Sequence, residues 1–220
     1  MKTTVSTTTK TSGLFILAVL TGLMTASVSQ AYQLSIVGTG TDQKFNYSGG
    51  ASGVNYTSSA QMGYGAGILI DHHFDRGVGI QFGVLYLNQK QNENLTDPAA
   101  VTLQRKLVQV PVTLRFHLLP GMTIGVGGYY SHTIGDNSVT DSSGNVTNES
   151  DAAEQLKSYD LGAVGGLALH LPLTQSCHFL ADARYLQSFT NQDTSGTVTT
   201  KPNGFQFMVG LTFGMMGSRN

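Results

Sequence analysis

Apolar and polar side chains alternate along most of this chain, and the clearest case is the segment from Leu107 to Ile134. In the first arm of this segment, every second residue is apolar: Val108, Val110, Val112, Leu114, Phe116 and Leu118. A β-strand sends successive side chains to opposite faces, so this arm predicts a strand with one apolar face and one polar face. Leu119-Pro120-Gly121 then predicts a tight turn, and a second alternating arm begins at Met122.

The same alternation predicts eight strands along the chain: 32–40, 61–74, 78–90, 107–118, 122–134, 156–171, 178–190 and 204–215. Polar loops at 41–60, 91–102, 136–155 and 191–203 alternate with short turns at 75–77, 119–121 and 172–177. An even number of antiparallel strands, with short turns at one end and long loops at the other, is typical of outer-membrane barrels. The pattern therefore predicts an all-β, eight-stranded antiparallel up-and-down transmembrane barrel in a bacterial outer membrane. Both termini are expected in the periplasm.

Composition helps to decide which face of these strands meets lipid. Charged residues make up 11% of the chain, against about 25% in a typical soluble domain. The alternatives are a lipocalin-like soluble barrel and a Gly- and Ser-rich secreted sandwich, both of which need a charged, wet exterior. Because the polar faces carry mostly Gly and few charges, we expect the apolar face to meet lipid. The polar face is then expected to fill a narrow lumen.

The first 31 residues predict a cleaved secretory signal peptide, which leaves residues 32–220 as the barrel domain. Lys2 and Lys10 precede an apolar stretch at 13–26, and Ser29-Gln30-Ala31 offers a small-x-small cleavage site. The remaining chain has 10 Lys and Arg (12 − 2) against 13 Asp and Glu, a net charge of −3. This charge gives no electrostatic reason to expect a nucleic-acid partner. Cys177 is the only cysteine, so no internal disulfide can form.

Aromatic residues on the apolar faces fall into two bands along the predicted strands. One band lies toward the long loops and contains Tyr64, Tyr86, Tyr130, Tyr159, Tyr185 and Phe189. The other lies near the short turns and contains Phe74, Phe116, Phe179 and Phe213. Aromatic rings favour both membrane–water interfaces, so the two bands support a membrane-spanning barrel with lipid-facing aromatics.

Five charged residues are predicted to point into the lumen: Asp71, Arg115, Asp160, Asp182 and Arg184. An unpaired buried charge is costly, so we expect each arginine to contact at least one of these acids. Such a network would seal the lumen against ions, and the alternative is a path for protons or solutes. Pro111 lacks a ladder donor and is expected to cause a bulge or to require a bridging water.

Three segments resemble a known family. GYGAGILIDHHF at 63–74, VQVPVTLRFHL at 108–118 and GMTIGVGGYYSHTIG at 121–135 are similar to strand-turn-strand signatures of the PorT-like outer-membrane β-barrel domain. That family looks like the eight-stranded OmpX and OmpA barrels. The resemblance implies insertion by the barrel-assembly machinery, with residues 205–213 as the recognition strand. The seven residues after Phe213 depart from related barrels, which often end on an aromatic residue.

The predicted function is a structural or surface-interaction role, in which the barrel presents long extracellular loops. The expected partners are outer-membrane lipid, lipopolysaccharide and an unidentified extracellular ligand, and a monomer is expected. No catalysis, cofactor or metal ion is predicted. The alternatives are a small-solute pore or transporter, and a lipid A-modifying enzyme built on Ser131, His132 and Asp136. Adjacent residues on a strand face opposite sides, which disfavours a dyad of Ser131 and His132.

Two further clusters raise the question of metal binding. Five of the six histidines lie toward the short turns: His72, His73, His117, His170 and His178. Their position favours interfacial or lumen hydrogen bonding over a metal site. The loop at 136–154 carries five acids, whose spacing differs from that of an EF-hand and favours a solvated loop.

Overall fold

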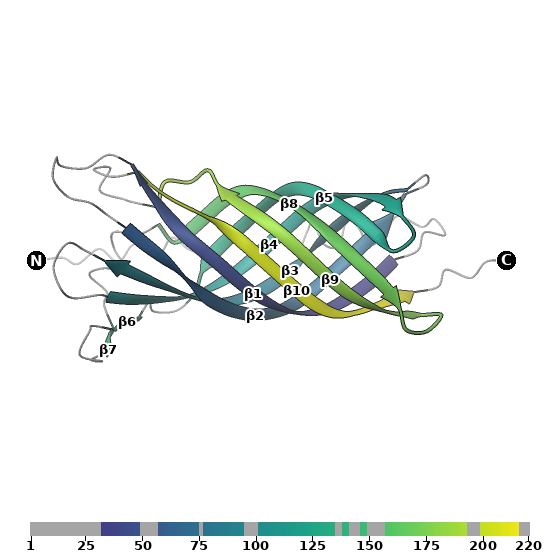
Figure 1. The fold of residues 1–220 in the computed structure, drawn as a ribbon, viewed down its shortest axis with the longest axis horizontal. Coiled ribbons are helices and arrows are strands. Elements are labelled where there is room, and N and C mark those ends of the chain that lie inside the picture. Colours follow the sequence, from purple (N-terminus) through teal and green to yellow (C-terminus); the bar gives the residue numbers. More distant parts are fainter. Residues whose placement is uncertain are drawn as a thin grey trace, which may run out of the picture.

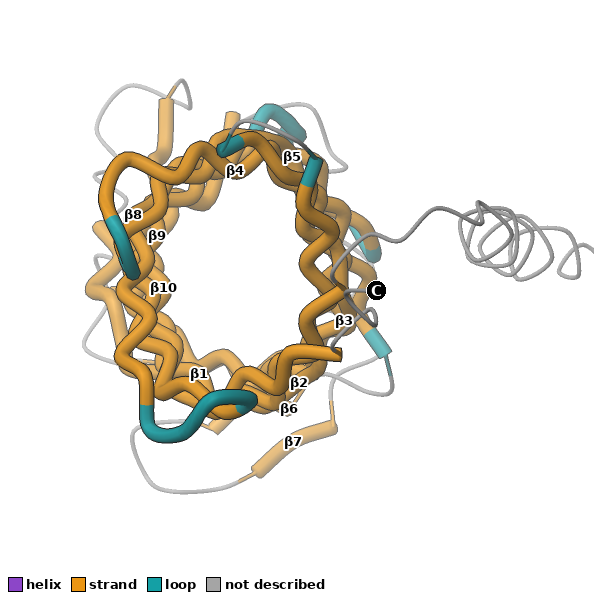
Figure 2. The backbone as a smooth tube through the Cα atoms, turned by 90° about the vertical axis from the view of Figure 1, so that its right-hand side faces the viewer, coloured by secondary structure: helices purple, strands orange, loops and turns teal. Residues whose placement is uncertain are grey.

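The computed structural model describes residues 32–48, 57–74, 77–94, 101–134, 138–140, 146–148, 157–192 and 199–215. These residues form one sheet that closes into a barrel (Figures 1 and 2). The barrel strands are β1 (Tyr32–Ser48), β2 (Thr57–His73), β3 (Val78–Asn94), β4 (Val101–Leu119), β5 (Met122–Thr133), β8 (Tyr159–Pro172), β9 (Cys177–Ser188) and β10 (Thr199–Met215). Two short strands, β6 (Ser138–Thr140) and β7 (Val146–Asn148), extend the sheet. No helix in the described ranges is long and apolar enough to cross a membrane.

The barrel closes where the first strand meets the last. β1 pairs antiparallel with β10 from Tyr32↔Met215 to Ser48↔Thr199, and it pairs with β2 on its other side. The pairing of β3 with β4 completes the ring, in the order β1-β2-β3-β4-β5-β8-β9-β10. The eight-stranded antiparallel barrel predicted from the alternation is confirmed.

Several strands continue beyond their predicted ends, and the loops between them are correspondingly shorter. β1 runs to Ser48 rather than to residue 40, and β10 begins at Thr199 rather than at 204. A strand of 17 residues, such as β1, is about 56 Å long at about 3.3 Å per residue. At a tilt of about 40° it rises about 43 Å, well beyond an apolar band of about 25 Å. The apolar alternation fades where a strand leaves lipid, although its backbone pairing continues.

The segment at 136–155, which was predicted to be loop, contains β6 and β7. β6 pairs with the start of β4 through Thr102↔Thr140, and β7 pairs with β6. These three-residue strands lie at the long-loop end of the barrel (Figure 1). β6 pairs with the edge of β4 that β5 leaves free, because the β4–β5 pairing begins only at Leu107. Alternation within three residues does not signal such a contact.

Pro111 interrupts one ladder without shifting it. On the β5 side, Pro111 pairs with Tyr129 in a continuous register. On the β3 side, pairing stops at Phe82↔Val112 and resumes at Leu85↔Gln109. The register is the same before and after this gap, because both strands skip two residues. The missing proline donor therefore leaves a gap in the β3–β4 ladder, and the bulge expected there is not formed. Register shifts occur instead between Ala60 and Tyr64, and between His117 and Leu119.

The apolar face of each strand points outward. Val112 is 46% exposed, whereas its neighbour Thr113 is 3% exposed and faces the lumen. The ten aromatics of the two predicted bands all lie on the outer surface, with exposed fractions from 36% for Phe179 to 64% for Phe189.

Inward glycines make room for the large side chains beside them. Six large inward residues each have a glycine as their direct cross-strand partner: Leu87 with Gly65, Leu85 with Gly67, Leu69 with Gly83, Arg115 with Gly125, Tyr129 with Gly162, and Arg184 with Gly166. A Cβ built on Gly166 would lie 2.8 Å from Arg184 Cγ, and one on Gly125 would lie 3.1 Å from an Arg115 guanidinium nitrogen. An eight-stranded barrel leaves little lumen space, so these glycines are a packing requirement.

The neighbouring glycines Gly165 and Gly166 allow a matched test of this packing. Gly166→Ala should lower the free energy of unfolding by about 1–3 kcal/mol, because the added methyl group overpacks the lumen against Arg184. Gly165→Ala should change it by less than about 0.5 kcal/mol, since a Cβ there has no atom within 4 Å. Urea unfolding in lipid vesicles measures both. Equal losses in the two variants would contradict this account of the inner glycines.

Candidate functional site

Four buried charges meet inside the lumen. Arg115 on β4 and Arg184 on β9 both donate to Oδ2 of Asp182, at 2.8 Å and 2.7 Å. Arg115 Nε also lies 3.7 Å from Oδ1 of Asp71 on β2. All four residues are at most 6% exposed. Two carboxylates and two guanidinium groups give this cluster a formal charge of zero.

Gln81 on β3 joins these charges across the barrel. Its amide nitrogen donates to both carboxylate oxygens of Asp71, at 3.1 Å and 2.9 Å, and its amide oxygen accepts a hydrogen bond from Arg184. β3 and β9 stand opposite each other in the strand order, so the Arg184–Gln81 bond crosses the lumen. We call Asp71, Gln81, Arg115, Asp182 and Arg184 the lumen charge layer.

A second bridge crosses the lumen nearer to the long loops. Gln206 on β10 donates to Gln109 on β4 at 3.1 Å, and these two strands also stand opposite each other. Gln109 lies six residues before Arg115 on the same strand.

Buried apolar side chains form a cluster from the same inner faces: Val37, Leu69, Leu85, Leu87, Leu107, Ala168, Leu180 and Met208. The inner wall thus combines polar bridges with apolar packing.

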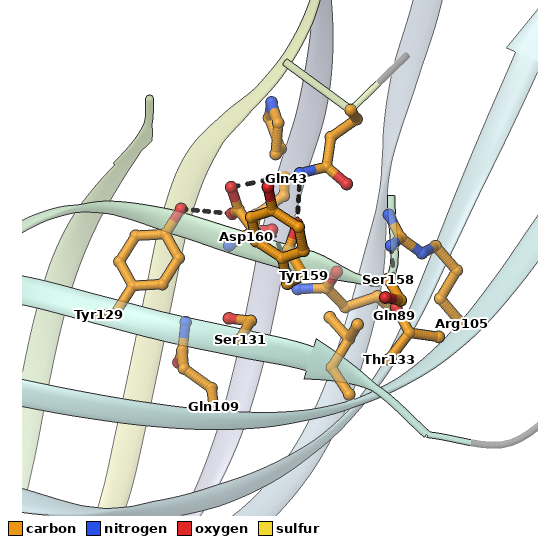
Figure 3. A pocket seen from close by; sticks show the side chains of 13 residues that line it. Gln43, Gln89, Arg105, Gln109, Tyr129, Ser131, Thr133, Ser158, Tyr159 and Asp160 are labelled. Carbon is orange, nitrogen blue, oxygen red and sulfur yellow. Dashed lines mark hydrogen bonds between the residues drawn. The ribbon is translucent and has the colours of Figure 1, made fainter. Parts of the chain in front are cut away.

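Asp160 lies apart from the lumen charge layer, at the long-loop end (Figure 3). Its carboxylate accepts hydrogen bonds from Tyr129 at 2.8 Å, from Ser188, and from Gln192 at 3.3 Å. Asp160, Tyr129 and Gln192 line a cavity of about 20 Å³, which we call the long-loop cavity and which is the size of a site for one water molecule. Arg105 lines it too, donating to Thr133 and to the Lys157 carbonyl.

A larger cavity of about 430 Å³ opens at the short-turn end, and we call it the short-turn cavity. It is lined by Gln33, Thr123, four histidines (His73, His117, His170 and His178), the turn residues Pro120 and Gly121, and Pro172 at the end of β8. His72 lies on the other face of β2, where its ring packs against Tyr32 and Phe74 at centroid distances of 4.6 Å and 4.9 Å. Among the described residues, no group of three or more His, Cys, Asp or Glu side chains is placed to hold a metal ion.

The residues considered for catalysis are separated by the barrel wall. Ser131 is 4% exposed and faces the lumen, opposite Asp160 on β8. His132 is exposed on the outer surface, where its ring stacks on Tyr130 with centroids 6.4 Å apart. Asp136 lies outside the described residues, as do the other four acids of the 136–154 loop.

The structure therefore brings together four of the five charges predicted to face inward and places Asp160 elsewhere. Gln81, Gln109 and Gln206 stand at inner-face positions of the predicted strands, but their neutral amides carry no charge that would predict a partner. Arg105 was missed because the predicted strand began at Leu107. Continuing the alternation backward by one more pair would have put Arg105 on the inner face.

These features define a transmembrane β-barrel, with apolar and aromatic side chains on its outer surface and polar groups inside. The chain belongs to the outer membrane protein beta-barrel domain family, whose model matches residues 25–194. It is accordingly a protein of the bacterial outer membrane. The family match does not distinguish the narrower PorT-like group within it.

Several solved structures are similar to this chain. OprG from Pseudomonas aeruginosa is 14% identical over 84% of this chain and 96% of its own, with a TM-score of 0.55. Ail from Yersinia pestis, solved with the heparin analogue sucrose octasulfate, is 12% identical over 83% and 99%, with a TM-score of 0.46. A major outer membrane protein from Thermus thermophilus is 13% identical over 84% and 99%, with a TM-score of 0.47. No curated protein matches the chain.

Removing the shared acid of the lumen charge layer should destabilise the barrel. Asp182→Asn should lower the free energy of unfolding by about 3–5 kcal/mol, because it leaves two buried guanidinium groups without their common counter-charge. The matched control, Asp42→Asn, alters an exposed residue of β1 and should change it by less than about 0.5 kcal/mol. Urea unfolding of both variants in lipid vesicles tests this, and a loss for Asp182→Asn no larger than the control's would show that the layer contributes little.

Proposed function

We propose that this protein is a structural or surface-interaction barrel, which displays its long loops outside the cell and neither conducts solutes nor catalyses a reaction. The observation that carries the proposal is the lumen charge layer. Its hydrogen bonds and ion pairs join β9 to β3 and β4, and join β2 to the same two strands, and every member is buried. With that layer closed, the lumen offers no continuous path, and the loops remain the part of the protein available to partners.

The absence of catalysis is part of this proposal. An acyl-transfer centre needs a nucleophile within hydrogen-bond reach of its base. Ser131 faces the lumen, whereas His132 faces outward, so the most favoured sequence candidates stand on opposite sides of the wall.

The proposed partners are outer-membrane lipid and lipopolysaccharide around the aromatic bands. The barrel-assembly machinery acts during insertion, and a ligand of unknown identity binds at the loops.

A small-solute pore is the second candidate, and one observation favours it. The lumen holds a cavity at each end, of about 20 Å³ near the long loops and about 430 Å³ near the short turns. A pore would require the layer between these cavities to open. Four charged groups held by several short hydrogen bonds oppose such an opening.

Planar-bilayer recording separates the two candidates. The wild-type barrel should show no conductance above the bilayer background. Replacing the cross-lumen pair by alanine, as Gln81→Ala with Arg184→Ala, should raise the conductance, because it removes the bond between opposite strands. Val84→Ala alters an outward residue and serves as the control. Heat-dependent gel mobility confirms that each variant is folded, and steady wild-type channels would support the pore instead.

The proposed orientation places the long loops outside and the short turns, with both termini, in the periplasm. Cys177, the single cysteine, begins β9 at the short-turn end. In intact cells, a large maleimide reagent that does not cross the outer membrane should leave Cys177 unmodified and should modify it after permeabilisation. Thr199→Cys in a Cys177→Ser background moves the thiol to the long-loop end and should react in intact cells. The reverse labelling pattern would invert the orientation.

A further inference from the structure

We propose that the short-turn cavity binds a transition-metal ion between His73 and His117. This inference is independent of the proposed surface role, because it concerns the opposite end of the barrel. Four of the chain's six histidines line this cavity, and two of them already approach each other through their ring nitrogens.

The spacing of the two imidazoles matches a pair of metal ligands. The Nε2 atoms of His73 and His117 are 3.0 Å apart, with ring centroids 4.6 Å apart and the ring planes inclined by 39°. Two nitrogens bound to one ion at about 2.0–2.1 Å lie about 2.9–3.4 Å apart when they occupy adjacent coordination positions. The ion would replace the single proton that the two nitrogens now share.

The tautomer of His117 is already the one that a metal ligand needs. Its Nδ1 lies 3.2 Å from the backbone carbonyl of Gly77. A carbonyl oxygen can only accept, so Nδ1 carries the proton and Nε2 of the neutral ring presents its lone pair toward His73. Metal-binding histidines almost always donate their second ring N–H in this way, which fixes the ring and raises its basicity.

Paired strands hold both histidines in place. His73 ends β2 and His117 lies near the end of β4, and β3 pairs with both of these strands. A backbone bond of 2.8 Å from the His117 amide to the Gly77 carbonyl ties β4 to the turn that follows β2. Ligands on paired strands are held more rigidly than ligands on loops, which favours a preformed site.

The two imidazole ligands determine the class of ion that the site would bind. No third protein ligand is positioned with the pair among the described residues, so water or a small molecule completes the coordination. The cavity of about 430 Å³ has room for more than ten waters at about 30 Å³ each. Imidazole ligands suit Zn²⁺, Cu²⁺ and Ni²⁺, whereas Mg²⁺ and Ca²⁺ favour oxygen ligands. His170 and His178 supply further imidazoles on the facing strands β8 and β9.

The charges above the cavity do not oppose a cation. Asp71 precedes His73 by two residues on β2, and Arg115 precedes His117 by two residues on β4, so the lumen charge layer lies next to the pair. Because this layer has two acids and two bases in contact, its formal charge is zero.

Titration with Cu²⁺ and Zn²⁺ tests the proposal directly. The full barrel, purified without a polyhistidine tag, should bind one Cu²⁺ by isothermal titration calorimetry, and the electron paramagnetic resonance spectrum should show coupling to ring nitrogens. His73→Ala and His117→Ala should each weaken binding about tenfold or more, the scale of loss seen when a metal site is disturbed. Mg²⁺ should not compete.

Two histidines outside the cavity provide matched controls. His72→Ala changes the adjacent residue on the opposite face of β2, and His132→Ala changes an exposed histidine at the other end of the barrel. Both should bind Cu²⁺ like the wild type, and heat-dependent gel mobility should show that all four variants fold. Absence of wild-type binding, or binding that survives in both His73→Ala and His117→Ala, would overturn the proposal.

Discussion

The structure depends on one constraint, which is that every backbone hydrogen-bonding group in lipid needs a partner within the protein. The chain meets it by pairing β1 with β10 over the full length of both strands. Closing only eight strands leaves a lumen just wide enough for side chains. That narrowness explains why large inward residues stand opposite glycines, as Arg184 stands opposite Gly166. It also explains why arginines and aspartates inside must contact one another, since little water can reach them.

The parts of the fold that lie in lipid could be predicted from the sequence, because lipid enforces strict alternation there. The segment from Leu107 to Leu119 is strand throughout, with its apolar face outward as expected. Beyond the membrane this selection ends, since both faces of a strand meet water. The continuation of β1 to Ser48 and the pairing of β6 with β4 depend on backbone bonds between distant segments. Side-chain periodicity does not report such bonds.

The residues of the candidate site could also be predicted only in part. Alternation places Asp71, Arg115, Asp182 and Arg184 on the inner face, but it does not give their height along the barrel axis. That height depends on the stagger between neighbouring strands. The stagger separates Asp160 from the other charges and pairs it with Ser131 on β5 instead. The spacing of His73 and His117 has the same origin. They are 44 residues apart in sequence and meet only because β2 and β4 pair with a common strand at a fixed register.

The lumen charge layer raises the question of why a barrel keeps four buried charges when apolar residues of similar volume pack as well or better. The pairing register of the strands gives a reason. Shifting a strand by one residue moves all of its side chains to the opposite face. For β4 or β9, such a shift would turn Arg115 or Arg184 toward lipid, at a cost that rises from about 0–1 kcal/mol near an interface to about 2–4 kcal/mol at the bilayer midplane. An inner face of Leu and Gly alone would tolerate the shift, because those residues are also acceptable to lipid. We infer that the charges select one register during closure.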